Sequence, residues 1–287
     1  MLTRLLFGVS TALLCVAGAV FTTGCGAPAE NVLVVRGSDT MVHLVSSWAE
    51  DFMAEHPEYE VSTTGGGSGT GIAALFNGTT DICASSRSLR QTELDQAEEL
   101  GIEPHKVEVA LDGMAIVVNS DNPIEELTLE QIRRIYAGEY TNWNQVGGND
   151  SEIVPVSREN NSGTYIYFQQ HVLNEQNYAT RVMPLPASSS IVQEVSQTRG
   201  AIGYVGLGYA SGDRPGLKVL GVKEDDDSPA IYPEVDTIYS GEYPIARPLY
   251  FYTNGEPTPA IQTFIDFCLS EQGDEIVIET GYVPMPE

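Results

Sequence analysis

The feature that most constrains the fold is a glycine-rich stretch, Gly65–Gly71, which reads Gly-Gly-Gly-Ser-Gly-Thr-Gly. An alternating apolar and polar run at 59–63 precedes it and predicts a strand, and an apolar run at 72–76 predicts a short helix after it. Glycines in such a turn allow successive backbone N–H groups to converge, and the helix N-terminus adds partial positive charge. We call this stretch the first cradle, and it is predicted to bind an anion.

A second stretch, at 158–164, repeats this chemistry with the sequence Arg-Glu-Asn-Asn-Ser-Gly-Thr. The apolar run at 153–156 predicts a strand before it, and a helix is expected to begin near Tyr165. We call it the second cradle. Two cradles about ninety residues apart favour a small anion held between two lobes.

The first strand and helix are predicted by the same strand-turn-helix pattern. The continuous apolar run at 32–35 is typical of a buried strand, and apolar residues recur at helical spacing over 41–52. Ser38 or Asp39 is expected to be the N-cap of that helix, because both side chains accept hydrogen bonds from free N–H groups.

Three further strands are expected up to the crossing into the second lobe. The run at 81–84 brings Ser86 and Arg87 to its end. The runs at 106–111 and 114–119 predict two separate strands, and the later one is interpreted as the crossing into the second lobe. Alternating strands and helices of this kind predict an α/β fold.

The second lobe is expected to contain a helix that begins after Thr128, with Gln131 completing a capping box. The apolar run at 248–252 predicts a strand that crosses back, and two helices finish the chain at 258–269 and 271–279. The resulting boundaries place lobe I at 31–114 and 249–287, and lobe II at 115–248.

The N-terminus is typical of an export signal. Arg4 precedes an apolar run at 5–21, which is shorter than the ~20 residues that span a bilayer. Residues 1–25 are interpreted as a signal peptide of the lipoprotein type, with Cys25 as the acylated residue, although Thr22 stands where leucine is usual. The alternative is cleavage after Ala27-Pro28-Ala29 and release of a free protein. Both imply an extracytoplasmic protein, in the periplasm or at the cell surface.

Net charge excludes one class of partner. The chain has 14 Lys+Arg against 40 Asp+Glu, a formal charge of −26, so nucleic acid is not an expected partner. An anionic ligand would be repelled at long range and must therefore be held by local dipoles.

Two cysteines lie outside the signal, Cys83 and Cys268, separated by about 185 residues. A single distant pair is no disulfide framework, so two buried free thiols are expected, with a disulfide as the alternative.

Four motifs occur in a consistent order over nearly all of the chain after the signal. They are the two cradles, the run Gly-Ala-Ile-Gly-Tyr-Val at 200–205 and the run Gly-Tyr-Val-Pro at 281–284. Together they resemble the PstS family, the periplasmic phosphate-binding proteins of phosphate-specific ABC importers. The resemblance implies a two-lobed periplasmic binding protein of type II, whose discontinuous lobes are joined by two crossing strands and close around buried phosphate.

The resemblance also implies which residues touch the ligand. The first-cradle serine of the family matches Ser68, and the turn after the first strand matches Asp39-Thr40. The ligand-binding residues expected on this basis are Asp39, Thr40, Ser68, Gly69, Ser86, Arg158, Ser162, Gly163 and Thr164.

Two positions depart from the family pattern. Many relatives carry aspartate in the turn after the third strand, where this chain has Ser86, and threonine where it has Asp39. Inorganic phosphate near pH 7 retains a proton, because it has one ionisable proton more than a phosphate monoester, whose second pKa is about 6, whereas sulfate has none to give. We therefore expect Asp39 to accept that proton, and Arg158 to be the charged donor. Arg87 is expected to pair with the ligand or with Asp39, and the alternative is a salt bridge at the surface or between the lobes.

An enzyme is the first rival interpretation. Ser68 or Ser162 would be the nucleophile of a secreted phosphatase, but a histidine would have to be brought to it by the fold. The four histidines, His43, His56, His105 and His171, share no spacing with either serine, and no metal-ligand motif occurs. No catalytic residue, metal or cofactor is therefore expected.

Nucleotides and other oxyanions are two further ligand classes that a glycine-rich turn could bind. Ile72 follows Gly71 where a P-loop requires lysine, and 69–74 fits the dinucleotide pattern only loosely, since no acidic residue follows in a clean βαβ unit. Another oxyanion, sulfate or molybdate, would suit the same architecture. The sequence thus favours an extracytoplasmic, monomeric protein that binds inorganic phosphate and delivers it to ABC permease subunits.

Overall fold

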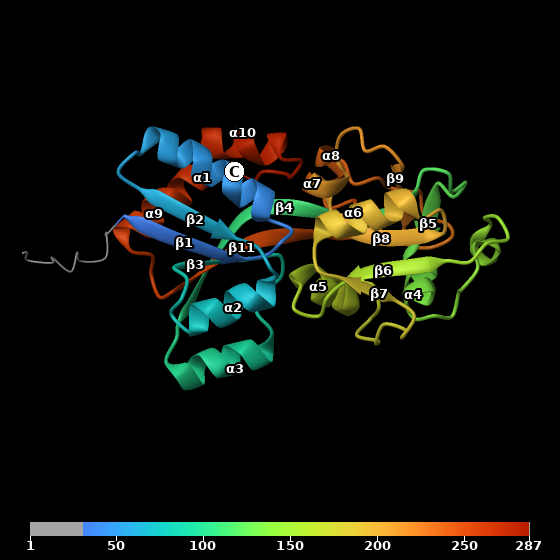
Figure 1. The fold of residues 1–287 in the computed structure, drawn as a ribbon, viewed down its shortest axis with the longest axis horizontal. Helices are drawn as coiled ribbons and strands as arrows, with labels where there is room; N and C mark the ends of the chain where they lie inside the picture. The colour runs from blue at the N-terminus through green and yellow to red at the C-terminus, as the bar shows by residue number, and fades with distance from the viewer. Residues whose placement is uncertain (1–30, 287) are drawn as a thin grey trace, which may run out of the picture. The chain divides into compact units, whose positions relative to one another are not determined.

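Strands and helices alternate along the chain, as the sequence predicts (Figure 1). The structure is a computed structural model and describes residues 31–286. The strands are β1 (Val32–Gly37), β2 (Glu60–Thr64), β3 (Ile82–Ser85), β4 (Pro104–Asn119), β5 (Glu126–Thr128), β6 (Val154–Arg158), β7 (Met183–Leu185), β8 (Ala201–Gly206), β9 (Leu217–Val219), β10 (Gly221–Lys223) and β11 (Ala246–Asn254). The helices are α1 (Val42–Glu55), α2 (Ser68–Phe76), α3 (Gln91–Leu100), α4 (Leu129–Tyr136), the 3₁₀ turn η1 (Trp143–Val146), α5 (Gly163–His171), α6 (Ser188–Gln197), α7 (Leu207–Ala210), α8 (Val235–Tyr239), α9 (Pro259–Cys268) and α10 (Glu271–Glu279).

The main sheet of residues 31–286 has nine strands, in the order β2-β1-β3-β11-β4-β8-β6-β7, with β9 also paired to β4. β1 pairs parallel with β2 and β3, and β6 pairs parallel with β7 and β8. β11 and β4 are antiparallel to each other and lie between these two groups (Figure 1). The chain therefore has two parallel groups of strands joined by the β4–β11 pair.

The central strands are buried on both faces because helices cover both. Along β3, Ile82 and Ala84 face a core formed with α1, α9 and α10, whereas Cys83 faces α2. β11 shows the same two-residue alternation, with Phe251 on the first face and Tyr252 on the second. Their sequences are accordingly continuous apolar runs, which is what a strand buried on both faces requires.

The buried side chains form separate cores on the two sides of the β4–β11 pair. The first core is drawn from residues 33–110 and 249–282, and includes Trp48 and Phe264. The second and third are drawn from residues 114–245, with Val283 added. We call the elements around the first core lobe I (β1–β3, α1, α2, α9, α10) and those around the other two lobe II (β6, β8, α4–α7).

One expected break is absent. β4 is a single strand of 16 residues, where the sequence predicted separate strands at 106–111 and 114–119. Asp112 and Gly113 interrupt the apolar pattern, but both lie inside the ladder that pairs β4 with β11. A buried partner for Asp112, described below, explains why the strand does not end there.

Several local predictions are confirmed. Thr128 caps α4, and its hydroxyl accepts a hydrogen bond from the backbone N–H of Gln131 at 3.1 Å. α5 begins at Gly163, two residues before the predicted start. Cys83 and Cys268 are both buried free thiols. No helix within the described residues has the length and apolar character needed to cross a membrane.

Candidate functional site

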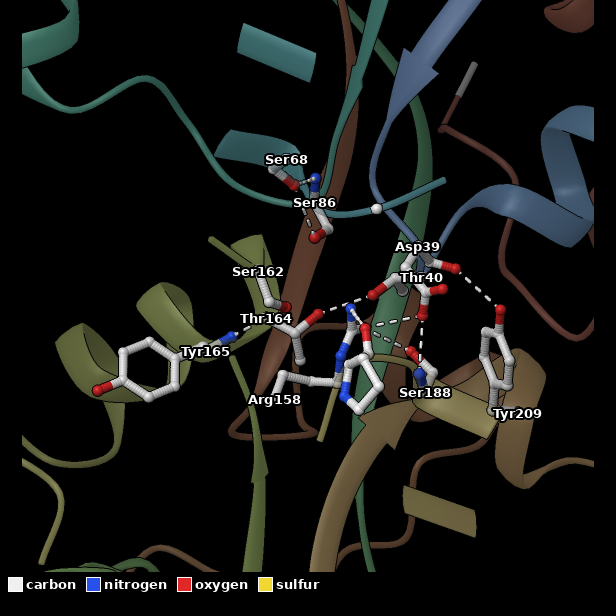
Figure 2. A network of polar contacts seen from close by, with 12 residues as sticks. Asp39, Thr40, Ser68, Ser86, Arg158, Ser162, Thr164, Tyr165, Ser188 and Tyr209 are labelled. Carbon is white, nitrogen blue, oxygen red and sulfur yellow. Dashed lines mark hydrogen bonds and ion pairs between the residues drawn. The ribbon is translucent and has the colours of Figure 1, made fainter. Parts of the chain in front are cut away.

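The loops after β1, β2 and β3 lie against the loop after β6, so that the carboxyl ends of strands from both lobes face one another (Figure 2). The backbone N–H of Gly69, in the first cradle, donates to the carbonyl of Asn161, in the second, at 2.9 Å. Open α/β sheets bind ligands outside the carboxyl ends of their strands. The two cradles therefore meet at the place where this fold supports a ligand site.

In the first cradle, α2 begins at Ser68, which is completely buried. The Ser68 hydroxyl accepts the backbone N–H of Ser86 at 3.0 Å, and the two hydroxyl oxygens lie 3.3 Å apart. Gly67 has φ of +118°, and an added Cβ would lie 2.7 Å from the carbonyl oxygen of Asn161. A side chain at Gly67 would therefore separate the two cradles.

In the second cradle, Ser162 caps α5 by accepting the backbone N–H of Tyr165 at 3.4 Å. Gly163 packs directly on lobe I, because an added Cβ would lie 2.2 Å from the hydroxyl oxygen of Ser68 and 2.6 Å from that of Ser86. The N-termini of α2 and α5 thus begin at one cluster, where their free N–H groups and partial positive charges favour an anion.

Two threonines join the lobes beside this cluster. The hydroxyl oxygens of Thr40 and Thr164 lie 2.7 Å apart, although 124 residues separate them in the sequence. The hydroxyl of Tyr282 donates to the backbone carbonyl of Thr40 and fixes the turn after β1. Thr40 and Thr164 are both buried, so their bond is shielded from water.

The charged part of the site is an ion pair between the lobes. Oδ2 of Asp39 accepts Nη1 of Arg158 at 2.9 Å and the backbone N–H of Ser188, the first residue of α6, at 2.7 Å (Figure 2). The expectation that Ser38 or Asp39 caps α1 is therefore wrong. The N-cap residue of α1 is Met41, without a side-chain cap, because the Asp39 carboxylate is turned toward lobe II.

Arg158 is held on several sides. It also donates to the Ser188 hydroxyl at 2.9 Å and to the Pro186 carbonyl at 2.8 Å. Burial lowers the pKa of Arg158, and the negative charge of Asp39 acts in the opposite direction. A guanidinium stays protonated in proteins, so the site contains a fixed positive charge.

Two donors next to the cluster lack partners. Within residues 31–286, the buried hydroxyl of Ser38 and the buried Nε of Arg158 make no hydrogen bond. Buried polar groups are almost always hydrogen-bonded in native proteins. Ser38 belongs to the turn after β1 and Arg158 ends β6, so both groups lie on segments that carry the cluster.

Arg87 does not pair with Asp39. Its two terminal nitrogens donate to the two carboxylate oxygens of Glu93, both at 2.7 Å. Glu93 also accepts the backbone N–H of Arg90 at 2.8 Å, and these bonds hold the pKa of its carboxyl at about 2 against the effect of burial. Arg87 thus forms a buried salt bridge inside lobe I, whereas the sequence alternative was a salt bridge at the surface or between the lobes.

The predicted site residues on both cradles and on the turns after β1 and β3 come together, and the structure adds four that sequence reasoning missed. Tyr209 of α7 donates to the Asp39 carbonyl at 2.8 Å, and Ser188 has the contacts given above. Asp112 and Arg247 form a buried ion pair, with Nη2 and Oδ2 2.8 Å apart. The sequence indicates this pair only through one charged residue in each of two apolar strands, because a buried charge requires a partner of opposite charge. Tyr209 carried no local signal.

The chain is similar in sequence to known phosphate-binding proteins over most of its length. The sequence profile of the PBP superfamily domain matches residues 25–272. The phosphate-binding protein PstS of Pseudomonas aeruginosa is 32% identical over 267 residues, covering 87% of this chain and 82% of that protein. PstS of Bacillus subtilis is 32% identical over 261 residues, covering 90% of this chain and 82% of that protein.

Solved structures are similar over the same length. A putative phosphate ABC transporter substrate-binding protein from Clostridium perfringens, with bound phosphate, has a TM-score of 0.79 and 30% identity and covers 89% of this chain and 100% of that one. An ABC-type phosphate transport receptor from Vibrio cholerae has a TM-score of 0.71 and 31% identity, with coverage of 88% and 100%. These matches bear out the expected two-lobed fold of a periplasmic binding protein.

Proposed function

This chain belongs to the PstS family of phosphate-binding proteins within the PBP superfamily, and from that premise we propose that it binds inorganic phosphate between its two lobes and delivers it to an ABC importer. Binding is reversible and involves no covalent step. The lobes close on the ligand by rotation at the β4–β11 pair and open to release it at the membrane subunits.

The observation that carries the proposal is the wall of buried donors that the two cradles form together. It contains hydroxyl groups from both lobes, two helix N-termini and the guanidinium of Arg158, and Ser68, Ser162 and Thr164 are each no more than 2% exposed. Such donors suit an oxyanion, and charge-assisted hydrogen bonds to it are about twice as strong as neutral ones. The ligand-binding residues we propose are Asp39, Thr40, Ser68, Gly69, Ser86, Arg158, Ser162, Gly163 and Thr164.

We assign selectivity to the carboxylate of Asp39. Among the described residues, both hydrogen bonds to this carboxylate use Oδ2, so Oδ1 remains to accept the proton of hydrogen phosphate. Sulfate has no proton at neutral pH, and it would face a negative charge without a hydrogen bond in return. A buried group left unpaired costs about 1–3 kcal/mol or more, which discriminates against sulfate.

A phosphatase is the alternative that the two serines raise. The Ser68 hydroxyl bonds to Ser86, and the Ser162 hydroxyl accepts a backbone N–H of α5. Neither contact involves a histidine. Nucleophilic serines need an adjacent base. We therefore propose a binding protein without catalytic residues, and turnover of a chromogenic phosphate ester would contradict this.

The finer organisation is also part of the proposal. We assign lobe I to 31–114 and 249–287 and lobe II to 115–248. The buried cores support this division except at Met114 and Val283, which pack in the core of lobe II. The predicted signal at 1–25, the lipidated Cys25 and the alternative site at 27–29 lie outside the described residues. We propose an extracytoplasmic monomer that is anchored through Cys25. Fatty-acid labelling of the expressed protein that persists in Cys25→Ala would contradict the anchor.

Calorimetric titration tests the proposed ligand. The purified protein is stripped of bound anion by unfolding and refolding and is then titrated with phosphate, sulfate and molybdate at pH 7. The proposal expects one phosphate per chain and no heat from sulfate or molybdate. Binding of sulfate or molybdate without phosphate would leave the fold intact and overturn the assigned ligand.

A further inference from the structure

The two strands that join the lobes carry a buried ion pair outside the predicted site. Asp112 of β4 and Arg247 of β11 stand opposite each other in the ladder, and Oδ2 of Asp112 accepts both Nε, at 3.0 Å, and Nη2, at 2.8 Å. The exposed fractions of the side chains are 0% and 1%. Oδ1 of Asp112 accepts the backbone N–H of Leu207, at the start of α7. Such a pair loses so much hydration that it contributes little to stability on balance.

The pair is connected to the ligand site through one hydroxyl. Nη2 of Arg247 also donates to the hydroxyl oxygen of Thr164 at 3.1 Å, and that oxygen lies 2.7 Å from the hydroxyl of Thr40. A guanidinium only donates hydrogen bonds, so the Thr164 oxygen is an acceptor from Arg247. A donor bond from a charged group polarises a hydroxyl and makes it a stronger donor to its next neighbour.

These contacts give the two hydroxyls a preferred direction. Thr164 accepts from Arg247 and donates to Thr40, and the hydrogen of Thr40 is then left for the ligand. We propose that Arg247, held by Asp112, is a positioning residue that keeps the Thr164–Thr40 pair as a hydrogen-bond donor toward phosphate. On this part of the wall the ligand then meets the hydrogen of Thr40, and the charged acceptor of the site is Asp39. This inference rests on the proposed function.

The direction determines which ionic form of phosphate fits. Hydrogen phosphate has one proton, which Asp39 accepts, whereas dihydrogen phosphate has two and would need a second acceptor. With Arg247 in place, the hydrogen of Thr40 is directed at the ligand, which disfavours Thr40 as that second acceptor. Phosphate binding should therefore strengthen as pH rises through the second ionisation of phosphate, whose pKa is about 6 for a monoester.

Other charged and titratable groups surround the pair and bear on a pH profile. Arg247 lies 5.2 Å over the ring of Tyr167, and it acts on His171 of the same helix, whose pKa is lowered by burial first and by Arg247 second. Burial raises the pKa values of Tyr167, Tyr243 and Tyr282, so these phenols stay neutral near pH 7. Of these groups His171 alone carries an imidazole, the side chain whose ordinary pKa lies near neutral pH, and it is controlled separately.

The test compares wild type with the double variant Asp112→Asn/Arg247→Met. Asparagine retains an acceptor for the Leu207 N–H, and methionine fills the space of Arg247 without a donor or a charge. Phosphate dissociation constants are measured at pH 5.5, 6.5, 7.5 and 8. The wild-type affinity should rise with pH, whereas the double variant should bind about tenfold more weakly at pH 8 and show little dependence on pH.

Three controls separate positioning from a general structural effect. Arg247→Lys keeps a cationic donor and should retain most of the wild-type pH dependence. His171→Gln and Arg199→Met, which remove a titratable group and an exposed guanidinium, should leave the profile unchanged. In a Thr164→Val background, the loss caused by the double variant should fall below about threefold, because the hydroxyl it acts through is absent.

The outcomes are distinguishable. A wild-type protein that does not bind phosphate overturns both the proposed function and this inference. A wild-type protein that binds phosphate, together with a double variant that loses equal affinity at every pH or equal affinity with and without Thr164, overturns only the positioning role of Arg247. Thermal melts of all variants show whether they are folded at the temperature of the titration.

Discussion

Oδ2 of Asp39 lies 2.9 Å from Nη1 of Arg158, although 119 residues separate them in the sequence. The pair joins the turn after β1 to the end of β6, and it adds a carboxylate to a wall that otherwise contains donors. The carboxylate should therefore set the relative affinity of the site for a protonated oxyanion, such as hydrogen phosphate, and an unprotonated one, such as sulfate.

Replacing Asp39 by asparagine should reduce discrimination. Asp39→Asn removes the negative charge that accepts the phosphate proton, so phosphate should bind about tenfold more weakly, and sulfate, no longer repelled, should become measurable. The charge-matched control Asp51→Asn, on the exposed face of α1, should change neither affinity. Unchanged phosphate and sulfate binding in Asp39→Asn would rule out Asp39 as the acceptor.

Closure of the lobes should depend on the absence of a side chain at Gly163. An added Cβ would lie 2.2 Å from the Ser68 hydroxyl oxygen, which is too close for two non-bonded atoms when the lobes are in contact. Gly163→Ala should therefore weaken phosphate binding by at least about 100-fold, as expected when a close interlobe contact becomes a clash. The melting temperature of the ligand-free protein should change little, because the clash is absent when the lobes are apart. Near-normal affinity in Gly163→Ala would show that the cradles do not meet on binding.

The hydroxyl of Tyr209 should contribute to affinity without touching the ligand. It donates to the backbone carbonyl of Asp39 across the lobes at 2.8 Å. Tyr209→Phe removes this interlobe hydrogen bond, so phosphate should bind about fivefold more weakly, which corresponds to about 1 kcal/mol. The control Tyr239→Phe alters a tyrosine that is 54% exposed, and calorimetry should show no effect.

The ion pair in lobe I should make stability depend on pH. The folded-state pKa of Glu93 is about 2, below its ordinary value of 4.5, because Arg87 and Arg90 bond to its carboxylate. A carboxyl with a depressed folded pKa contributes stability that is present above its unfolded pKa and is lost as pH falls through the folded value. Glu93→Gln should therefore lower the free energy of unfolding by about 2 kcal/mol at pH 7, and the difference from wild type should shrink between pH 4.5 and 2.

Urea unfolding at several pH values measures this dependence. The control Glu98→Gln lies on the exposed side of the same helix and should be close to wild type at every pH. A difference between Glu93→Gln and wild type that is constant from pH 7 to pH 2 would mean that the charge of Glu93 is not what stabilises the loop.

The local parts of the site could be predicted from sequence because each cradle is specified by adjacent residues. Glycine and serine between a strand and a helix mark the anion-binding turn, and Thr128 with Gln131 marks a helix start in the same way. Those signals depend on a few neighbouring residues, and the structure places them where the sequence predicted.

The contacts between lobes could not be predicted in this way. Asp39 follows a strand and precedes a helix, which suggests an N-cap, but its carboxylate has stronger partners in Arg158 and Ser188 of the other lobe. Asp112 suggested a strand end because a charge rarely lies inside a buried strand, and only the opposite Arg247 makes it acceptable. The contacts of Asp39 and Asp112 both depend on how distant segments pack, and local sequence patterns do not predict that packing.

The most direct test of the central claim is a crystal structure of the protein grown with phosphate at pH 7. The account predicts one phosphate between the cradles, with oxygens within hydrogen-bonding distance of Ser68, Thr40 and Arg158 and one oxygen facing Oδ1 of Asp39. Phosphate bound elsewhere, or a site between the cradles that stays without phosphate at saturating concentration, would contradict it.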